Sequence, residues 1–93
     1  MVAVTQLELF LPYTHSLKEK RSIVKSIISQ LRNKYNVSVA ETDFQEQWQR
    51  TLIEVAAVAN EYSFLQKERD TVVRFVENFS EVEIIRTETE YYD

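Results

Sequence analysis

The spacing of hydrophobic and polar residues changes several times along this chain, and each period predicts one element of secondary structure. From residue 2 to residue 11, apolar residues alternate with polar ones, which is typical of a strand with one buried face. Gln6 and Glu8 lie on one face, and the buried face consists of Ala3, Leu7, Leu9 and Leu11. Pro12 and the polar residues after it end the strand.

A helical period follows over residues 17–35, where apolar side chains recur every three or four positions. Ser16 and Glu19 form a capping-box pattern, in which each side chain bonds to the backbone amide of the other residue. Asn36 ends the helix, since asparagine tolerates the left-handed conformation. The apolar stripe consists of Leu17, Val24, Ile27, Ile28, Leu31 and Tyr35.

The remaining pattern predicts strands over residues 37–44, 50–60 and 82–92, with a second helix before the last strand. Ser63 and Gln66 predict another capping box at the start of that helix. The order βαββαβ favours a single ferredoxin-like α+β domain over residues 1–93, a two-layer sandwich with a four-stranded antiparallel sheet and both helices on one face. We expect a shared core of Leu7, Leu9, Ile27, Leu31, Ile53, Val55, Val72 and Val76.

The amino-acid composition excludes several kinds of catalytic and metal-binding site. The chain has no cysteine and one histidine, so thiolate catalysis, disulfides and multi-histidine metal sites within one chain are excluded. It also has no glycine, which the phosphate-cradling loops of nucleotide-binding enzymes require. We therefore expect a non-enzymatic binding module without cofactor or metal. The N-terminus has no basic leader or membrane span, which predicts a cytoplasmic protein.

Charge is unevenly distributed. The net charge is −4, yet residues 17–35 hold six bases and one acid, so this segment sums to +5 and the remainder to −9. At 100° per residue, Lys18, Arg21, Lys25 and Arg32 fall within a sector of about 60° beside the apolar stripe. Four cations in a row suit the phosphates of a nucleic acid, so RNA or a ribosomal subunit is a candidate partner. The alternative is a solvated helix face, or one paired with acids of the same chain.

Three strings give a resemblance to a known family. SLKEKR at residues 16–21, NVSVAE at 36–41 and WQR at 48–50 are similar to the YlxP-like family, a small bacterial family labelled as a domain of unknown function. The resemblance implies the ferredoxin-like fold and a bacterial cytoplasmic setting. Members often lie beside genes for transcription-termination and translation-initiation factors, which implies a ribosome- or RNA-associated role. The family supplies no catalytic residues.

The uncovered sheet face predicts a second contact. Its outward apolar residues would form a patch facing water, and such patches usually mark contacts. This favours a homodimer, and the alternative function is a homodimeric protein-interaction or regulatory domain with no nucleic-acid partner. A monomer screened by Glu8, Glu54 and Arg86 remains open. The candidate self-association residues are Val4, Phe10, Leu52, Ala56 and Val58.

Other side chains invite weaker hypotheses. His15 and Ser16 suggest a catalytic pair oriented by Glu41 or Asp43, but a helix cap already accounts for the serine. Glu46 with those two acids suggests a hard-cation site, although carboxylates near a strand end are usually plain surface. Trp48 is expected to pack over the sheet edge or against a partner.

Overall fold

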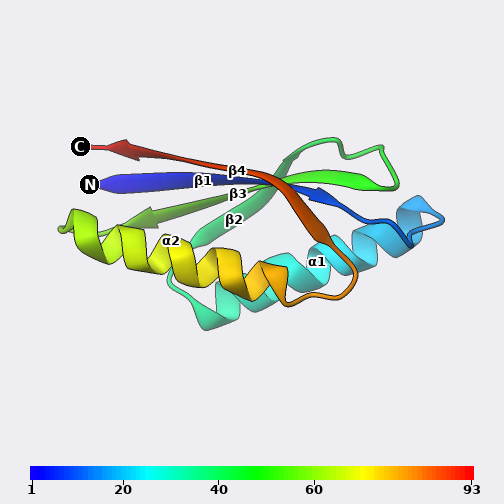
Figure 1. Cartoon of the computed structure of the whole chain (residues 1–93), viewed down its shortest axis with the longest axis horizontal. Coiled ribbons are helices and arrows are strands. Elements are labelled where there is room, and N and C mark those ends of the chain that lie inside the picture. The colour runs from blue at the N-terminus through cyan, green and yellow to red at the C-terminus, as the bar shows by residue number, and fades with distance from the viewer.

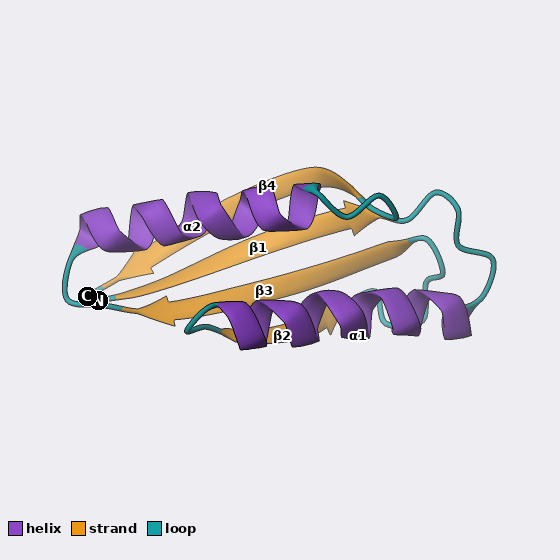
Figure 2. Ribbon diagram, turned by 90° about the horizontal axis from the view of Figure 1, so that it is seen from below, coloured by secondary structure: helices purple, strands orange, loops and turns teal.

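A computed structural model describes all 93 residues and confirms the predicted element order. The sheet order is β2-β3-β1-β4 with antiparallel neighbours, and both helices lie on one face (Figures 1 and 2). This is the ferredoxin-like arrangement. Neither helix is long and apolar enough to cross a membrane. The elements are β1 Val2–Phe10, α1 Leu17–Lys34, β2 Ser38–Asp43, β3 Arg50–Val58, α2 Tyr62–Glu77 and β4 Glu83–Tyr92.

The core lies between the helices and the two central strands, β1 and β3. All eight residues that we expected to share it belong to one cluster of 13 buried residues. Leu31 of α1 and Val76 of α2 are completely inaccessible, and so is Leu7 of β1. The apolar stripes of the helices therefore pack on the alternating face of the strands, as the two periods predict.

The start of α1 follows the predicted cap in part. The Glu19 amide donates to the Ser16 hydroxyl oxygen at 3.1 Å, and the Lys20 amide donates to the Ser16 carbonyl at 3.1 Å. The reciprocal bond of the capping box, from the Ser16 amide to the Glu19 carboxylate, is not formed. The helix ends one residue before the expected stop, because Tyr35 is already extended (φ −127°) with its ring edge-on to Phe75 at 5.7 Å.

The predicted cap of the second helix was wrong. Glu61, not Ser63, is the N-cap of α2, and no side chain caps it. The Ala59 amide donates to the Met1 carbonyl at 3.1 Å, which continues the β1–β3 pairing one residue beyond Val58. The first turn then closes with the Leu65 amide on the Glu61 carbonyl at 3.4 Å, so Ser63 lies inside that turn.

Candidate functional site

The four cations of the predicted basic row are all exposed on α1. Three of them, Arg21, Lys25 and Arg32, line a groove of about 590 Å³ between α1 and the edge strand β2. Lys18 lies one turn nearer the helix start, outside the groove. The other lining residues are Val24, Ile28, Ser29, Asn33, Ala40 and Glu41, so the groove has an apolar floor and cations along one wall.

Acids of the same chain neutralise little of this charge. Arg21 faces Glu46 at 3.9 Å, with 63% and 81% of the two side chains exposed, and such a surface pair contributes little. Lys18 and Lys25 form no ion pair. Arg32 donates from Nη2 to the Val39 carbonyl at 2.6 Å, which fixes its guanidinium group beside β2 and leaves other N–H groups free.

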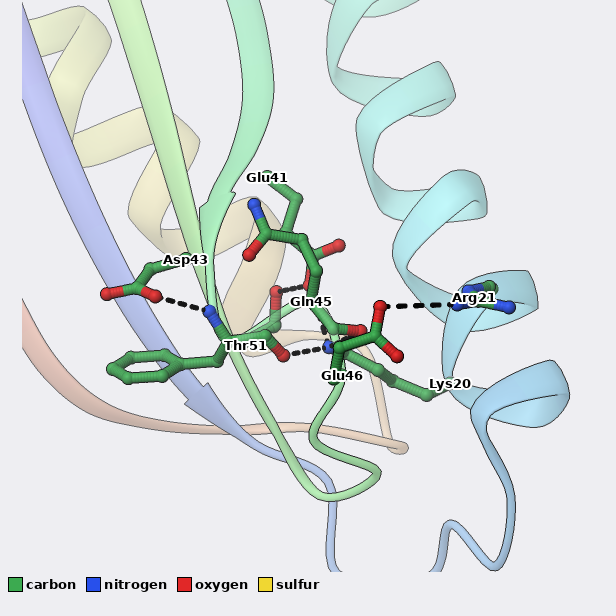
Figure 3. Close-up of polar contacts among 8 residues, drawn as sticks. Lys20, Arg21, Glu41, Asp43, Gln45, Glu46 and Thr51 are labelled. Atoms are coloured by element: carbon green, nitrogen blue, oxygen red, sulfur yellow. Dashed lines mark hydrogen bonds and ion pairs between the residues drawn. The ribbon is translucent and has the colours of Figure 1, made fainter.

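A fully buried lysine joins the two walls of the groove. Lys20 Nζ lies 2.8 Å from Glu41 Oε2 and donates to the carbonyls of Phe44 at 2.6 Å and Gln45 at 3.3 Å. Figure 3 shows Lys20 and Arg21 reaching from α1 to the β2–β3 hairpin. Thr51 donates its hydroxyl to the same Glu41 oxygen at 2.5 Å. The carboxylate is therefore satisfied by a buried cation and a buried hydroxyl.

The sequence analysis did not predict the pairing of Lys20 with Glu41, although two signals could have revealed it. Lys20 precedes the buried Val24 by one helical turn, and Glu41 shares the core-facing parity of Val39 two residues before it. A lysine and an acid that both sit on core-facing positions are expected to pair, because neither charge can be buried alone.

The suggested catalytic and cation sites do not assemble. Glu41 is bonded to Lys20, Asp43 accepts the Phe44 amide at 2.7 Å, and Glu46 points to Arg21. The three acids thus have different partners, and no group of three or more His, Asp or Glu side chains is placed to hold a metal ion. Ser16 is occupied as the helix cap, and the nearby His15 is exposed without a hydrogen bond to either acid.

The hairpin after β2 brings one aromatic side chain to the other face of the sheet. Phe44 has φ +62°, a left-handed conformation that is rare for a bulky residue. Its ring lies 3.8 Å from the Arg50 guanidinium carbon, a cation–π distance. Arg50 pairs in register with Phe10, so this stack belongs to the sheet face that no helix covers, which we call the open face.

A charged network crosses the middle of the open face. Glu8, with 12% of its side chain exposed, lies 2.8 Å from Arg50 and 3.3 Å from Arg86. The hydrogen bond from Arg50 is the main reason that the pKa of Glu8 is lowered from its usual 4.5, with desolvation opposing it and Arg86 adding to it. Hydrogen bonds to Glu88 and Glu8 raise the pKa of Arg86.

The expected apolar patch lies on this face but is not continuous. Val58 is 72% exposed, whereas Leu52 is only 8% exposed because it sits between Glu8 and the bulged end of β2. Polar residues, Gln6 and Glu54, separate the two ends of the patch. The third strand turns Arg50, Leu52, Glu54, Ala56 and Val58 toward the open face, in register with Phe10, Glu8, Gln6, Val4 and Val2 of β1.

Sequence reasoning missed an apolar hollow at the hairpin end of the open face. Its volume is about 440 Å³, and Phe10, Trp48 and Ile85 are its apolar lining. Ile85 is exposed because a bulge interrupts the β1–β4 pairing. Glu8 pairs with Arg86 and Leu9 with Ile84, so Ile85 has no partner residue on β1. A bulge of this kind leaves no clear period in the sequence, so the pattern alone did not reveal the hollow.

Comparison with known proteins places the chain in a family. The family described as "Protein of unknown function (DUF503)" matches residues 2–89. The chain belongs to this family. It is also 37% identical over 92 residues to the "Uncharacterized protein YlxP" of Bacillus subtilis (strain 168), covering 99% of this chain and all of that protein. The YlxP-like resemblance is thereby confirmed. Lys20 and Glu41, the two ends of the buried ion pair, lie in two of the three strings that suggested this resemblance.

Proposed function

We propose that this DUF503 protein is a non-enzymatic binding protein whose α1–β2 groove contacts the phosphate backbone of RNA, either free or in a ribosomal subunit. One observation carries the proposal: Arg21, Lys25 and Arg32 line the same groove, and their one ion pair is the exposed contact of Arg21 with Glu46 at 3.9 Å. Phosphate contacts of this kind position a protein without reading sequence.

The reach of the basic face fits several successive phosphates. Lys18 and Arg32 are fourteen positions apart on one helix, which corresponds to about 21 Å at 1.5 Å per residue. Beside these charges, Ser29 and Asn33 offer neutral donors in the groove. A hydroxyl and an amide can bond to a phosphate oxygen or a ribose 2′-hydroxyl.

The two walls of the α1–β2 groove are held in place by hydrogen bonds and an ion pair, which favours ligand binding. Lys20 ties α1 to the hairpin from inside the core, and Arg32 ties the far end of the helix to the backbone of β2. The groove is therefore shaped before a ligand arrives, which reduces the entropy lost on binding. Its ionisable side chains are cations, apart from Glu41, which is bonded to Lys20. This composition suits anion binding better than acid–base chemistry.

The charge of the whole chain limits contact to this side. Lys20 is internal, so α1 exposes five cations against Glu19, while residues outside 17–35 sum to −9. An acidic remainder repels nucleic acid, and binding is then oriented as well as salt-sensitive.

Fluorescence anisotropy with a labelled single-stranded RNA, supported by cosedimentation with ribosomal subunits, tests the proposal. We expect a Kd of about 10⁻⁴ to 10⁻⁶ M with little sequence preference. Arg21→Gln/Lys25→Gln should weaken binding at least about tenfold, and Lys67→Gln/Arg74→Gln on α2, which changes net charge equally, should not. Equal losses in the two variants would mean that only the net charge matters, and the proposal would fail.

A further inference from the structure

The open face carries a second feature that the RNA proposal does not use. Trp48 is 53% exposed and Ile85 is 56% exposed, and both line the hollow at the hairpin end together with Phe10. Large apolar side chains in one hollow on an otherwise polar face are typical of a contact site. Arg50 also lines the hollow, held by Glu8 and by the Phe44 ring.

Toward the opposite end, the same face becomes acidic. Glu54, Glu88 and Glu90 line a small notch of about 70 Å³ with Val4 and Tyr92. Glu54 accepts from the Gln6 amide at 3.3 Å and Glu90 from the Tyr92 hydroxyl at 2.6 Å, which leaves both negative charges without a cation. Beyond the notch, Val2 pairs with Val58 and Tyr92 to form an apolar row.

The negative charge of the open face determines which kinds of ligand can bind there. By register, six carboxylates stand on this face against the guanidinium groups of Arg50 and Arg86, a net charge of −4; they are Glu8, Asp43, Glu54, Glu83, Glu88 and Glu90. This repels nucleic acid and anionic lipid. Two open faces packed on each other would double the charge to −8 within a single interface. Like charges across an interface disfavour association.

A second copy docking through its basic helix is also a poor fit. The residues that α1 turns outward around its cations are serines, glutamine and asparagine, and none is apolar. Such a surface could approach the acidic notch, but it has no side chain to fill the hollow. The occupant must combine positive charge with an apolar anchor.

We propose that the open face binds a cationic segment of another protein, whose aliphatic or aromatic side chain enters the hollow of Phe10, Trp48 and Ile85 while its lysines or arginines meet Glu54, Glu88 and Glu90. This is independent of the RNA proposal, because α1 lies on the opposite face of the sheet (Figure 1). The two faces would let the protein contact RNA on one side and a basic polypeptide on the other.

The spacing on β4 sets the design of a probe. Ile85 and Glu88 are three residues apart and Ile85 and Glu90 five, about 10 and 17 Å at 3.4 Å per residue. On a helical ligand these lengths correspond to about seven and eleven residues. The probe is therefore an alanine-based helical peptide with a leucine at one position and lysines seven and eleven positions later. A matched peptide has glutamine in place of the lysines.

Trp48 is the only tryptophan of the chain, so its emission reports directly on the hollow. We expect a saturable blue shift with the lysine peptide and a Kd at least about tenfold higher after Ile85→Ser or Glu88→Gln/Glu90→Gln. The control Glu77→Gln/Glu81→Gln, which removes two exposed acids outside this face, should leave the Kd unchanged.

Three results would overturn the proposal. They are no shift of Trp48 emission at millimolar peptide, an equal shift with the glutamine peptide, and a shift that grows with protein concentration without peptide. The last result would show that a second copy covers the hollow. None of them depends on RNA binding, so failure here and failure of the groove are distinguishable.

Discussion

The Lys20 ammonium lies 2.8 Å from the Glu41 carboxylate, and this contact joins the first helix to the edge strand beside it. Lys20 has no solvent exposure, while 17% of the Glu41 side chain is exposed. The same ammonium bonds the carbonyls of Phe44 and Gln45, where the hairpin begins. One buried lysine therefore fixes both the groove wall and the start of the hairpin.

We expect Lys20→Met to destabilise the protein by about 3 kcal/mol, because it leaves a partly buried carboxylate and two carbonyls without their cation. Adding Glu41→Gln should recover at least about 1 kcal/mol, since the neutral amide oxygen still accepts from Thr51. Urea denaturation of the two variants measures both quantities. A loss below about 1 kcal/mol for Lys20→Met would show that the pair is not structural.

Leu31→Ala should cost about 2–5 kcal/mol, because Leu31 is completely buried between α1 and the sheet. The control Asn33→Ala, two positions on and exposed, should stay within about 0.5 kcal/mol. Thermal and chemical unfolding followed by circular dichroism compare the two. Similar effects at both positions would contradict the packing described for α1.

The two predicted helix caps should behave differently. Ser16→Ala removes the bond from the Glu19 amide and should cost about 1 kcal/mol. Ser63→Ala should have almost no effect, because Ser63 lies inside the first turn of α2 and caps nothing. The denaturation midpoints of the two variants, compared at equal m values, measure these losses of stability. A larger loss for Ser63→Ala than for Ser16→Ala would contradict the observed helix starts.

Glu8 should contribute to loss of stability in acid. Its folded pKa is lowered from 4.5, so the unfolded chain binds the proton more readily. The stabilisation is fully present above pH 4.5 and is lost as the pH falls through the lowered folded pKa. Glu8→Gln should therefore lose stability relative to the parent at pH 7, with the difference shrinking below pH 4.5. A difference that stays constant from pH 7 to pH 3 would contradict the network around Arg50 and Arg86.

Most of the fold was predictable because it rests on local patterns. Periods of two and of three to four residues identified all six elements, and the eight core residues followed from these same periods. The start of α2 was missed because it follows the end of the β1–β3 pairing, where the Ala59 amide still bonds to the Met1 carbonyl, a contact between residues far apart in the sequence.

The candidate sites were predictable only in part. Helical spacing found the cations of the groove, because one element carries Arg21, Lys25 and Arg32. It did not find the Lys20–Glu41 pair or the hollow at Trp48, because these depend on how separate elements meet. Ile85 in particular lies on the open face because of a β-bulge, and such a bulge leaves no periodic pattern in the sequence.

The salt dependence of RNA binding tests the central claim most directly, because it counts the phosphates that the basic face neutralises. If Lys18, Arg21, Lys25 and Arg32 each neutralise one phosphate, log Kobs should fall against log[salt] with a slope of about −3 for single-stranded RNA. Arg21→Gln/Lys25→Gln should flatten that slope by about 1.4 units, and Lys67→Gln/Arg74→Gln should leave it at the parent value. The same slope in the parent and in the Arg21→Gln/Lys25→Gln variant would contradict the account and make the basic row an ordinary solvated helix face.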